Sequence, residues 1–153
     1  MEIKDIDGRV LLVKSDTDGV RDFDSAELAR ANFSGATLEG ADFSDAHLEG
    51  ADFSNADLYW TIFFRANLQR ARLDGANLRG SDLKEANLQG ANLKNADFGS
   101  SNVGGGAQLQ GANLRDADLT GSNLVSAEYD GRTRFPTDFS PQSRGMVFVE
   151  SPG

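Results

Sequence analysis

The chain has 153 residues, a formal net charge of −9 and no cysteine. This length suits a single domain, and the absence of cysteine excludes disulfide bonds and thiolate metal sites and is typical of a reducing cytoplasm. We expect a cytoplasmic protein without a signal peptide, because the N-terminus is acidic and its longest apolar run extends only from Val10 to Val13. We expect neither a membrane span nor direct binding of nucleic acid.

Residues 1–20 are predicted to form an N-terminal β-hairpin cap and a lead-in to the rest of the chain. Two apolar stretches between Ile3 and Val13 flank Asp7-Gly8, a dipeptide favoured in tight hairpin turns. The run Asp16-Thr17-Asp18-Gly19 faintly resembles a calcium loop, but it lacks the third ligand and the glycine at the sixth position. It is interpreted as a turn, and no metal site is expected.

A five-residue unit, A-(D/N)-(L/F)-x-x, repeats twenty-two times from Arg21 to Asp130. Its apolar residues occupy positions i−2 and i, as in Ala41, Phe43, Ala46 and Leu48. An α-helix would scatter them, because five residues advance the pattern by about 140°. A continuous strand would turn every second unit to the wrong face. The remaining possibility is that each unit forms a short strand followed by a two-residue corner. Glycine often occupies the last position of the corner, where its backbone freedom is useful. Asp or Asn at i−1 can form a hydrogen bond with neighbouring backbone.

A longer period predicts four walls in each coil. Phenylalanine and leucine alternate with a period of ten, as in Phe23, Leu28, Phe33, Leu38 and Phe43. A coil of twenty residues would therefore place phenylalanine on two opposite walls and leucine on the other two. Alanine is also replaced about every twenty residues, provided that Gly104-Gly105-Gly106 adds one residue at a corner; the replacements are Thr61, Ser81, Ser101 and Ser122. We expect an all-β, quadrilateral parallel β-helix of about five and a half coils over residues 21–130.

The repeat stops after Asp130, and residues 131–153 are predicted to form a C-terminal capping tail. A rod of parallel strands exposes an unpaired edge at each end, so covering segments are expected there. The tail carries four large apolar side chains, which are interpreted as lids over the core, with contact between two copies of the chain as the alternative; they are Phe135, Phe139, Met146 and Phe148.

Runs such as A-D-F-S-D-A-H-L-E-G-A-D-F-S-N-A-D-L at 41–58 and A-N-L-R-G-S-D-L-K-E-A-N-L-Q-G-A-N-L at 76–93 resemble the pentapeptide-repeat proteins. The resemblance covers about 110 of the 153 residues. It implies a right-handed quadrilateral β-helix. Some members of the family are DNA mimics that bind DNA gyrase, and some pair through their C-terminal ends. The resemblance therefore also implies a topoisomerase as one candidate partner and a homodimer through the C-terminal cap as one candidate assembly.

Two outward surfaces are candidate contact sites, and the first is aromatic. Four large apolar side chains are predicted to point outward around one corner, at positions that are elsewhere almost wholly polar or glycine. Arg65 beside Trp60 could form a cation–π contact. The alternative is that these side chains pack on one another or lie under the hairpin or the tail. The aromatic candidate comprises Tyr59, Trp60, Ile62, Phe64 and Arg65.

The second surface is acidic. From Ala31 to Phe64 there is no lysine or arginine, and residues 21–64 hold 9 acidic and 2 basic side chains. Duplex DNA carries one charge per ~1.7 Å, so the local density is sufficient for mimicry although the footprint is short. A solvated surface that aids solubility is the simpler explanation. The candidate carboxylates are Glu39, Asp42, Asp45, Glu49, Asp52 and Asp57.

Catalytic residues are not expected, because the interior is predicted to be filled by Leu, Phe and Ala, leaving no cleft. His47 is the single histidine and is predicted to lie at the surface. No cofactor is expected. The sequence therefore predicts a non-enzymatic, rigid scaffold for protein–protein interaction with an unidentified partner. The alternative is an acidic DNA mimic that binds gyrase or another DNA-binding protein.

Overall fold

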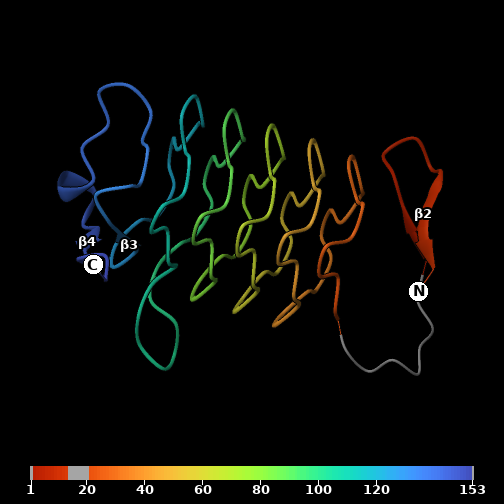
Figure 1. Cartoon of the computed structure of the whole chain (residues 1–153), viewed down its shortest axis with the longest axis horizontal. Helices are drawn as coiled ribbons and strands as arrows, with labels where there is room; N and C mark the ends of the chain where they lie inside the picture. Colours follow the sequence, from red (N-terminus) through yellow and green to blue (C-terminus); the bar gives the residue numbers. More distant parts are fainter. Residues whose placement is uncertain (1, 14–20, 153) are drawn as a thin grey trace.

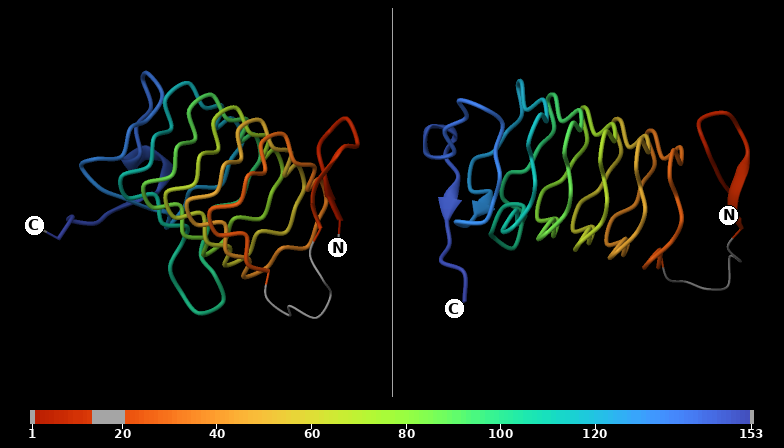
Figure 2. Two further views of the ribbon diagram at one scale, coloured as in Figure 1. Left: turned by 45° about the vertical axis from the view of Figure 1, so that its right-hand side comes forward. Right: turned by 45° about the horizontal axis from the view of Figure 1, so that its top comes forward.

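The computed structural model describes residues 2–13 and 21–152 (Figure 1). In these ranges the chain winds into stacked coils, with a hairpin at one end and the C-terminal segment at the other (Figures 1 and 2). The predicted turn at residues 16–19 lies outside the described residues. No helix in the described ranges is long and apolar enough to cross a membrane. The labelled elements are β1 (Glu2–Lys4), β2 (Val10–Val13), β3 (Glu128–Tyr129), η2 (Gln142–Arg144) and β4 (Val147–Phe148).

Each five-residue unit forms one segment of wall and one tight corner. In the unit centred on Phe43, the N–H of Ala46 donates to the carbonyl oxygen of Phe43 at 3.1 Å and closes a β-turn. Asp45, the third residue of this turn, has a φ of 54°. This positive φ is the conformation that favours glycine, which explains why glycine recurs at that position. The predicted bond from i−1 is also present, since Asp42 Oδ1 accepts from the N–H of Ser44 at 2.8 Å.

Four units make one coil. Parallel bridges join residues twenty apart, from Asp22↔Asp42 to Asn77↔Asp97. We number the walls by their central residues: wall 1 contains Phe23 and its stacked equivalents, and walls 2, 3 and 4 begin with Leu28, Phe33 and Leu38. Phenylalanine rings stack along walls 1 and 3, which are opposite; the centroid distances are 4.7 Å for Phe23–Phe43, 5.3 Å for Phe43–Phe63 and 4.9 Å for Phe33–Phe53. This register confirms the four-walled prediction.

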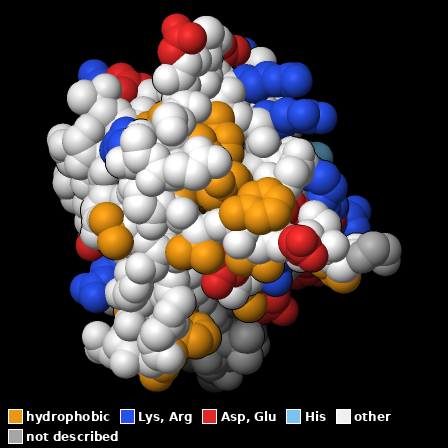
Figure 3. All heavy atoms as spheres, turned by 90° about the vertical axis from the view of Figure 1, so that its left-hand side faces the viewer, with side chains coloured by type: hydrophobic (Ala, Val, Ile, Leu, Met, Phe, Trp, Pro, Cys, Tyr) orange, Lys and Arg blue, Asp and Glu red, His pale blue; other side chains and the backbone are white. Residues whose placement is uncertain are grey.

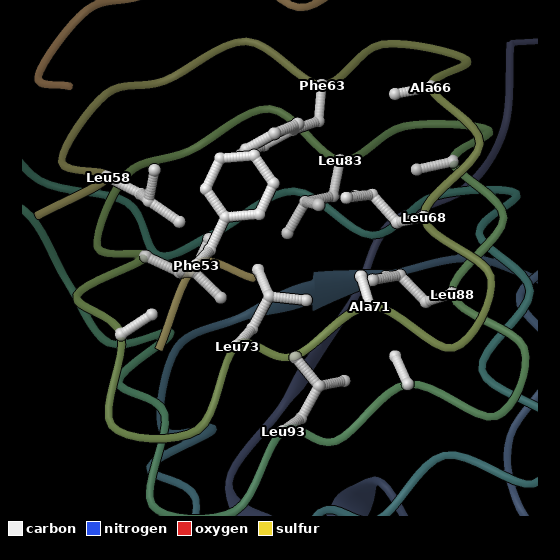
Figure 4. Packing of buried hydrophobic residues seen from close by; sticks show 14 of the residues in the cluster. Phe53, Leu58, Phe63, Ala66, Leu68, Ala71, Leu73, Leu83, Leu88 and Leu93 are labelled. Atoms are coloured by element: carbon white, nitrogen blue, oxygen red, sulfur yellow. The ribbon is translucent and has the colours of Figure 1, made fainter. Parts of the chain in front are cut away.

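The central Leu and Phe side chains and the i−2 alanines point into the tube, as Figure 4 shows for Phe53, Leu58, Leu68 and Leu73. All four labelled side chains are fully buried. Burying each contributes on the order of 2 kcal/mol in transfer free energy. The core is thus distributed along the rod, and side chains that contact other molecules belong to the outer walls and corners.

One prediction about the register is wrong. Beyond Ser81 the bridges join residues 26 apart, from Asp82↔Gln108 to Asp97↔Asn123, so six residues and not one are inserted before Leu109. The count of twenty-two units places Val103 at the centre of a unit, but its side chain is 75% exposed. It belongs to the loop that projects from the stacked coils near residue 100 (Figure 1). The error arose because Val103 falls five residues after Phe98, which imitates the repeat.

The predicted column of polar replacements is therefore also wrong. Thr61 and Ser81 occupy the i−2 position of wall 1, whereas Ser101 lies in the inserted segment. Ser122 lies on wall 4, because it is two residues before Leu124. The buried hydroxyl groups of Thr61, Ser81 and Ser122 each donate to a backbone carbonyl oxygen, at 3.0, 2.7 and 2.7 Å, which makes these replacements compatible with the core.

Residues 101–106 form the insert loop, which is closed by its own hydrogen bonds. The N–H of Ala107 donates to the carbonyl oxygen of Phe98 at 2.9 Å, the same turn bond that other units make between residues three apart. Within the loop, Ser101 Oγ donates to the carbonyl oxygen of Gly104 at 2.9 Å. A Cβ atom at Gly106 would lie 2.5 Å from the carbonyl oxygen of Ser126, so glycine is required where the chain re-enters the coil.

Deleting residues 101–106 should preserve the β-helix. The deletion joins Ser100 to Ala107 and restores the unbroken pattern A-D-F-G-S-A-Q-L-Q-G. Ser100 would then take the positive-φ corner position, which Ser25 and Ser126 already occupy with φ of 56° and 70°. We expect a thermal midpoint within about 5 °C of wild type by circular dichroism.

A five-residue deletion, 101–105, is the matched control. It leaves one residue too many at the corner, so it should lower the midpoint further than the six-residue deletion does. If the six-residue deletion were the less stable of the two, the loop would be part of the folding unit rather than an insertion.

The hairpin bonds to the first coil. Strands β1 and β2 pair antiparallel, with Ile3 opposite Leu12. The carbonyl oxygen of Lys4 accepts from the N–H of Asn32 at 2.8 Å, and Asp5 bridges Ala31 in antiparallel fashion. The Ile3 side chain is buried. These contacts cover part of the strand edge at this end of the rod.

The C-terminal segment packs on the other end. Strand β4 lies parallel to β3, with the N–H of Val147 donating to the carbonyl oxygen of Ala127 at 2.8 Å. Met146 is buried, and the rings of Phe135 and Phe139 stack with centroids 5.0 Å apart. Phe148, however, is 55% exposed, so its interpretation as a core lid is wrong. It lies on the outermost strand, where one side contacts β3 and the other faces solvent, and Figure 3 shows apolar side chains gathered on this end.

Candidate interaction site

The aromatic residues span wall 1 from corner to corner. Tyr59 and Trp60 form the corner between walls 4 and 1, Ile62 lies at the i−1 position of wall 1, and Phe64 lies at the corner between walls 1 and 2. The prediction that they surround one corner is therefore wrong, because one wall separates the two pairs. Trp60 is 46% exposed and Ile62 is 36% exposed, whereas Tyr59 and Phe64 are half-buried.

The predicted contact between Arg65 and Trp60 is wrong. Its Nε lies 3.1 Å from Asp45 Oδ1, and its guanidinium carbon lies 5.9 Å from the centroid of the Phe64 ring. The reason is positional: Arg65 belongs to the corner between walls 1 and 2, on the far side of wall 1 from Trp60. In this fold, two corner residues that are five positions apart in the sequence are separated by one full wall of the coil.

The insert loop bonds Tyr59, and the next coil lies against Trp60. Tyr59 Oη accepts a hydrogen bond from the N–H of Asn102 at 3.0 Å, and this bond lowers the pKa of Tyr59 from its ordinary value. The Trp60 indole lies against the next coil, since a Cβ atom at Gly80 would be 3.1 Å from Trp60 Nε1 and 3.0 Å from Ser101 Cβ. The sequence offers cover by the hairpin or the tail only as an alternative to an exposed contact site. It gives no sign of the loop, because Asn102 is 43 residues beyond Tyr59.

The six candidate carboxylates lie around the coil rather than along one face. Three are close to the Tyr59–Trp60 corner: Glu39 at the corner itself, Asp42 on wall 1 and Asp57 on wall 4. The other three lie at the corner between walls 1 and 2, at the corner between walls 2 and 3, and on wall 3; they are Asp45, Glu49 and Asp52.

These two groups of carboxylates also differ in their partners. Asp45 pairs with Arg65 at 3.1 Å, and Asp52 pairs with Arg72 at 3.3 Å. Glu49 accepts from Asn67 Nδ2 at 2.6 Å and lies 3.6 Å from His47 Nδ1. By contrast, no cation of the described residues lies within 4.0 Å of the carboxylates of Glu39, Asp42 and Asp57.

We call the Tyr59–Trp60 corner with its two adjoining walls the Trp60 edge. On wall 1, the i−1 residues that flank Ile62 are Asp42 and Asp82, to which it is bridged directly. Of the acidic side chains on the edge, Asp82 has a cation partner, Lys84 Nζ at 3.3 Å, and the rest have none among the described residues. The acidic side chains are Asp22, Glu39, Asp42, Asp57, Asp82, Asp97 and Glu128.

Two arginines lie on the same edge and are both bonded to backbone. Arg21 Nη1 donates to the carbonyl oxygen of Glu39 at 3.2 Å, and Arg79 Nε donates to that of Ser100 at 2.8 Å. The edge therefore has a net negative charge with half-exposed apolar side chains at its centre. The opposite corner, between walls 2 and 3, is mixed, because Arg30, Arg70 and Arg115 alternate there with Glu49 and Asp116.

His47 lies on wall 2 between two carboxylates, 3.7 Å from Glu27 and 3.6 Å from Glu49. Its side chain is about half exposed. Across residues 2–13 and 21–152, no group of three or more His, Cys, Asp or Glu side chains could hold a metal ion.

A family model described as pentapeptide repeats matches residues 26–63, 61–99 and 105–128, with 8 copies. The chain belongs to the pentapeptide-repeat family. The matched ranges leave out residues 100–104, which contain most of the insert loop. Pentapeptide-repeat proteins are right-handed β-helices and are generally non-enzymatic, and this chain shares their β-helical solenoid.

Two solved structures illustrate the similarity. Rfr23, a pentapeptide-repeat protein of the cyanobacterium Cyanothece 51142, is 34% identical with a TM-score of 0.57, over 65% of this chain and 63% of Rfr23. This chain therefore matches less than two thirds of the length of Rfr23. A pentapeptide-repeat protein from the thylakoid lumen of Arabidopsis thaliana is 31% identical with a TM-score of 0.51, over 75% of this chain and 70% of that protein. No curated protein sequence matches the chain.

Proposed function

We propose that this pentapeptide-repeat protein is a non-enzymatic scaffold that binds a protein partner through the Trp60 edge. The observation that carries the proposal is Trp60, half-exposed yet held against Gly80, with the ring of Tyr59 beside it bonded to the insert loop. A large aromatic ring that is both fixed and exposed loses little conformational freedom when it is buried by a partner, and such rings are typical interface anchors. Ile62 extends the apolar surface, and Phe64 and Arg65 form its far rim.

DNA mimicry receives less support. A protein that replaces duplex DNA in a basic groove needs unpaired acidic side chains along one face. Three of the six candidate carboxylates lie away from the Trp60 edge, and Asp45 and Asp52 are paired with arginine. The carboxylates that do line the edge are interrupted by the apolar side chains of Trp60 and Ile62 and by two arginines, Arg21 and Arg79. We therefore propose that the protein does not inhibit DNA gyrase. A supercoiling assay with and without the protein tests this, and inhibition at stoichiometric concentrations would favour the mimic.

We further propose that residues 1–20 and 131–153 act as caps on the repeat region 21–130, in a cytoplasmic protein. Two copies could pair through the C-terminal cap, where the exposed fractions of Val147 and Phe148 are 47% and 55%. The charge distribution supports pairing through the C-terminal rather than the N-terminal ends. Residues 65–153 carry 10 acidic and 10 basic side chains, whereas residues 1–64 carry 14 acidic and 5 basic side chains. The N-terminal halves would repel each other.

Site-specific photo-crosslinking tests the scaffold function. A photoreactive phenylalanine analogue in place of Ile62 should capture a defined protein in cells that express this chain. The same analogue in place of Arg115, an exposed residue at the corner between walls 2 and 3, is the matched control and should not capture it. Capture at position 62 should be lost in Tyr59→Ala/Trp60→Ala, because both anchors are removed. Equal capture from both positions, or capture that survives the double substitution, would refute the proposed surface.

A further inference from the structure

The charges and the apolar side chains of the Trp60 edge together indicate which chemistry a partner must present. Ile62 is bridged to Asp42 on one side and to Asp82 on the other, so carboxylates flank the apolar side chain along the rod. Neighbouring coils are ~4.8 Å apart, which separates the two carboxylates by about 10 Å. An extended chain spans this distance with about three residues.

The insert loop adds one apolar side chain to this region. Its Ser101 lies beside Gly80, which Trp60 also contacts, its Asn102 bonds Tyr59, and its Val103 is 75% exposed. No charged residue occurs between Phe98 and Ala107. The apolar side chains of Trp60 and Ile62 therefore lie at the center of the edge. Glu39 and Arg79 flank them at the same corner in the neighbouring coils, and the adjoining walls are acidic.

We infer that the Trp60 edge binds an extended, basic segment of a partner protein that carries one apolar anchor residue. This inference rests on the proposed scaffold function and names the partner's chemistry. The anchor contacts Trp60 and Ile62; on one side of it a lysine or arginine pairs with Asp42, and on the other side a second one competes with Lys84 for Asp82. The unpaired carboxylates of Glu39 and Asp57 extend the attraction across the corner and speed association.

Other classes of ligand fit the edge less well. Nucleic acids and anionic membranes carry phosphate groups, which the excess of carboxylates repels. A neutral apolar segment would remove water from the carboxylates of Glu39, Asp42 and Asp57 without supplying a cation to pair with them. A basic segment with one apolar residue provides an apolar contact for Trp60 and Ile62 and cations for the carboxylates around them.

Trp60 is the single tryptophan of the chain, so its fluorescence reports binding at this edge directly. The probe is a synthetic nonapeptide with one central leucine and two lysines on each side in a serine background. Two comparison peptides replace lysine by glutamate or leucine by serine. The lysine–leucine peptide should change the Trp60 emission saturably, and its affinity should fall at least about fivefold between about 50 and about 500 mM salt. The glutamate peptide should not bind, and the peptide without leucine should bind more weakly.

Two triple variants separate local from general electrostatics. Glu39→Gln/Asp42→Asn/Asp57→Asn removes three negative charges from the edge, and Asp45→Asn/Glu49→Gln/Asp52→Asn removes the same number elsewhere. Asparagine is compatible with the fold, since Asn32 and Asn77 already make the i−1 bond and Asn55 and Asn95 already occupy the positive-φ corner position of Asp45. The edge variant should weaken peptide binding by about tenfold or more, and the control variant by less than about twofold.

Equal weakening in both variants, or equal emission changes with the glutamate peptide, duplex DNA or anionic vesicles, would overturn the inference. The same variants separate it from the proposed function. If a partner captured at position 62 depends on Trp60 but binds the edge variant as well as wild type, the scaffold function stands and the basic-segment inference falls. If nothing is captured while the lysine–leucine peptide binds as expected, the inference stands and the cellular role is wrong.

Discussion

Phe43→Ala should lower the free energy of unfolding by about 3–5 kcal/mol. Phe43 is fully buried, with its ring between those of Phe23 and Phe63 at centroid distances of 4.7 and 5.3 Å. It also meets Phe33 and Phe53 edge-on, at 5.5 and 5.6 Å. In a solenoid each coil contacts only its neighbours, so no distant part of the chain can move in to fill the cavity. Urea denaturation followed by circular dichroism measures the loss.

Phe43→Leu is the matched control. Leucine already fills the equivalent position further along wall 1, at Leu83 and Leu109, so this change should cost less than about 1.5 kcal/mol. Similar losses for the two substitutions would mean that the stacked rings contribute beyond their volume. A negligible loss for Phe43→Ala would contradict the packed interior.

Asp130→Asn should destabilise the C-terminal end by about 3 kcal/mol. The Asp130 side chain is fully buried and bonded on both oxygens. Oδ1 accepts from the N–H groups of Gly111, Arg132 and Thr133 at 2.9, 2.9 and 3.1 Å. Oδ2 accepts from Ser151 Oγ at 2.6 Å and from Arg132 Nε at 3.1 Å. An amide nitrogen in place of either oxygen would face donors, so bonds that join the last coil to the tail would be lost.

The same substitution should change how stability depends on pH. Burial by itself raises the pKa of Asp130, but the hydrogen bonds from Ser151, Gly111 and Arg132 outweigh it and hold the pKa well below its usual range. Stability from such a group is fully present above its unfolded pKa of about 3.9 and is lost as the pH falls toward the lower folded pKa. Between about pH 5 and 2, wild type should therefore lose stability more steeply than Asp130→Asn.

Urea midpoints measured across this pH range test both statements. Asp138→Asn is the matched control, because Asp138 is exposed in the same tail. It should leave both the midpoint and its pH slope close to wild type. If Asp138→Asn and Asp130→Asn behaved alike, the Asp130 network would not hold the tail to the last coil.

The outward and inward positions of the candidate site could be predicted from the repeat, but the neighbours of each residue could not. Trp60 and Ile62 occupy positions that point out of every unit, and both are exposed. Which residues share an edge depends on where each unit falls around the coil, and the partners come from coils twenty or more residues away. For this reason the sequence predicts Trp60 rather than Asp45 as the partner of Arg65, and it does not predict the contact of Asn102 with Tyr59.

The five-residue period by itself determined a tube of stacked coils, because a side-chain pattern of this period can be buried only by stacking. The ten-residue alternation of phenylalanine and leucine determined that each coil has four walls. Phenylalanine on opposite walls followed from the same arithmetic, since Phe23 and Phe33 are two walls apart. Only the tertiary structure decided the length of the insertion before Leu109, because Val103 satisfies the local pattern while the backbone bridges skip it. The tertiary structure also decided which carboxylates stay unpaired. An ion pair forms only where two side chains of neighbouring coils come within a few ångströms of each other, and this separation cannot be read from the sequence.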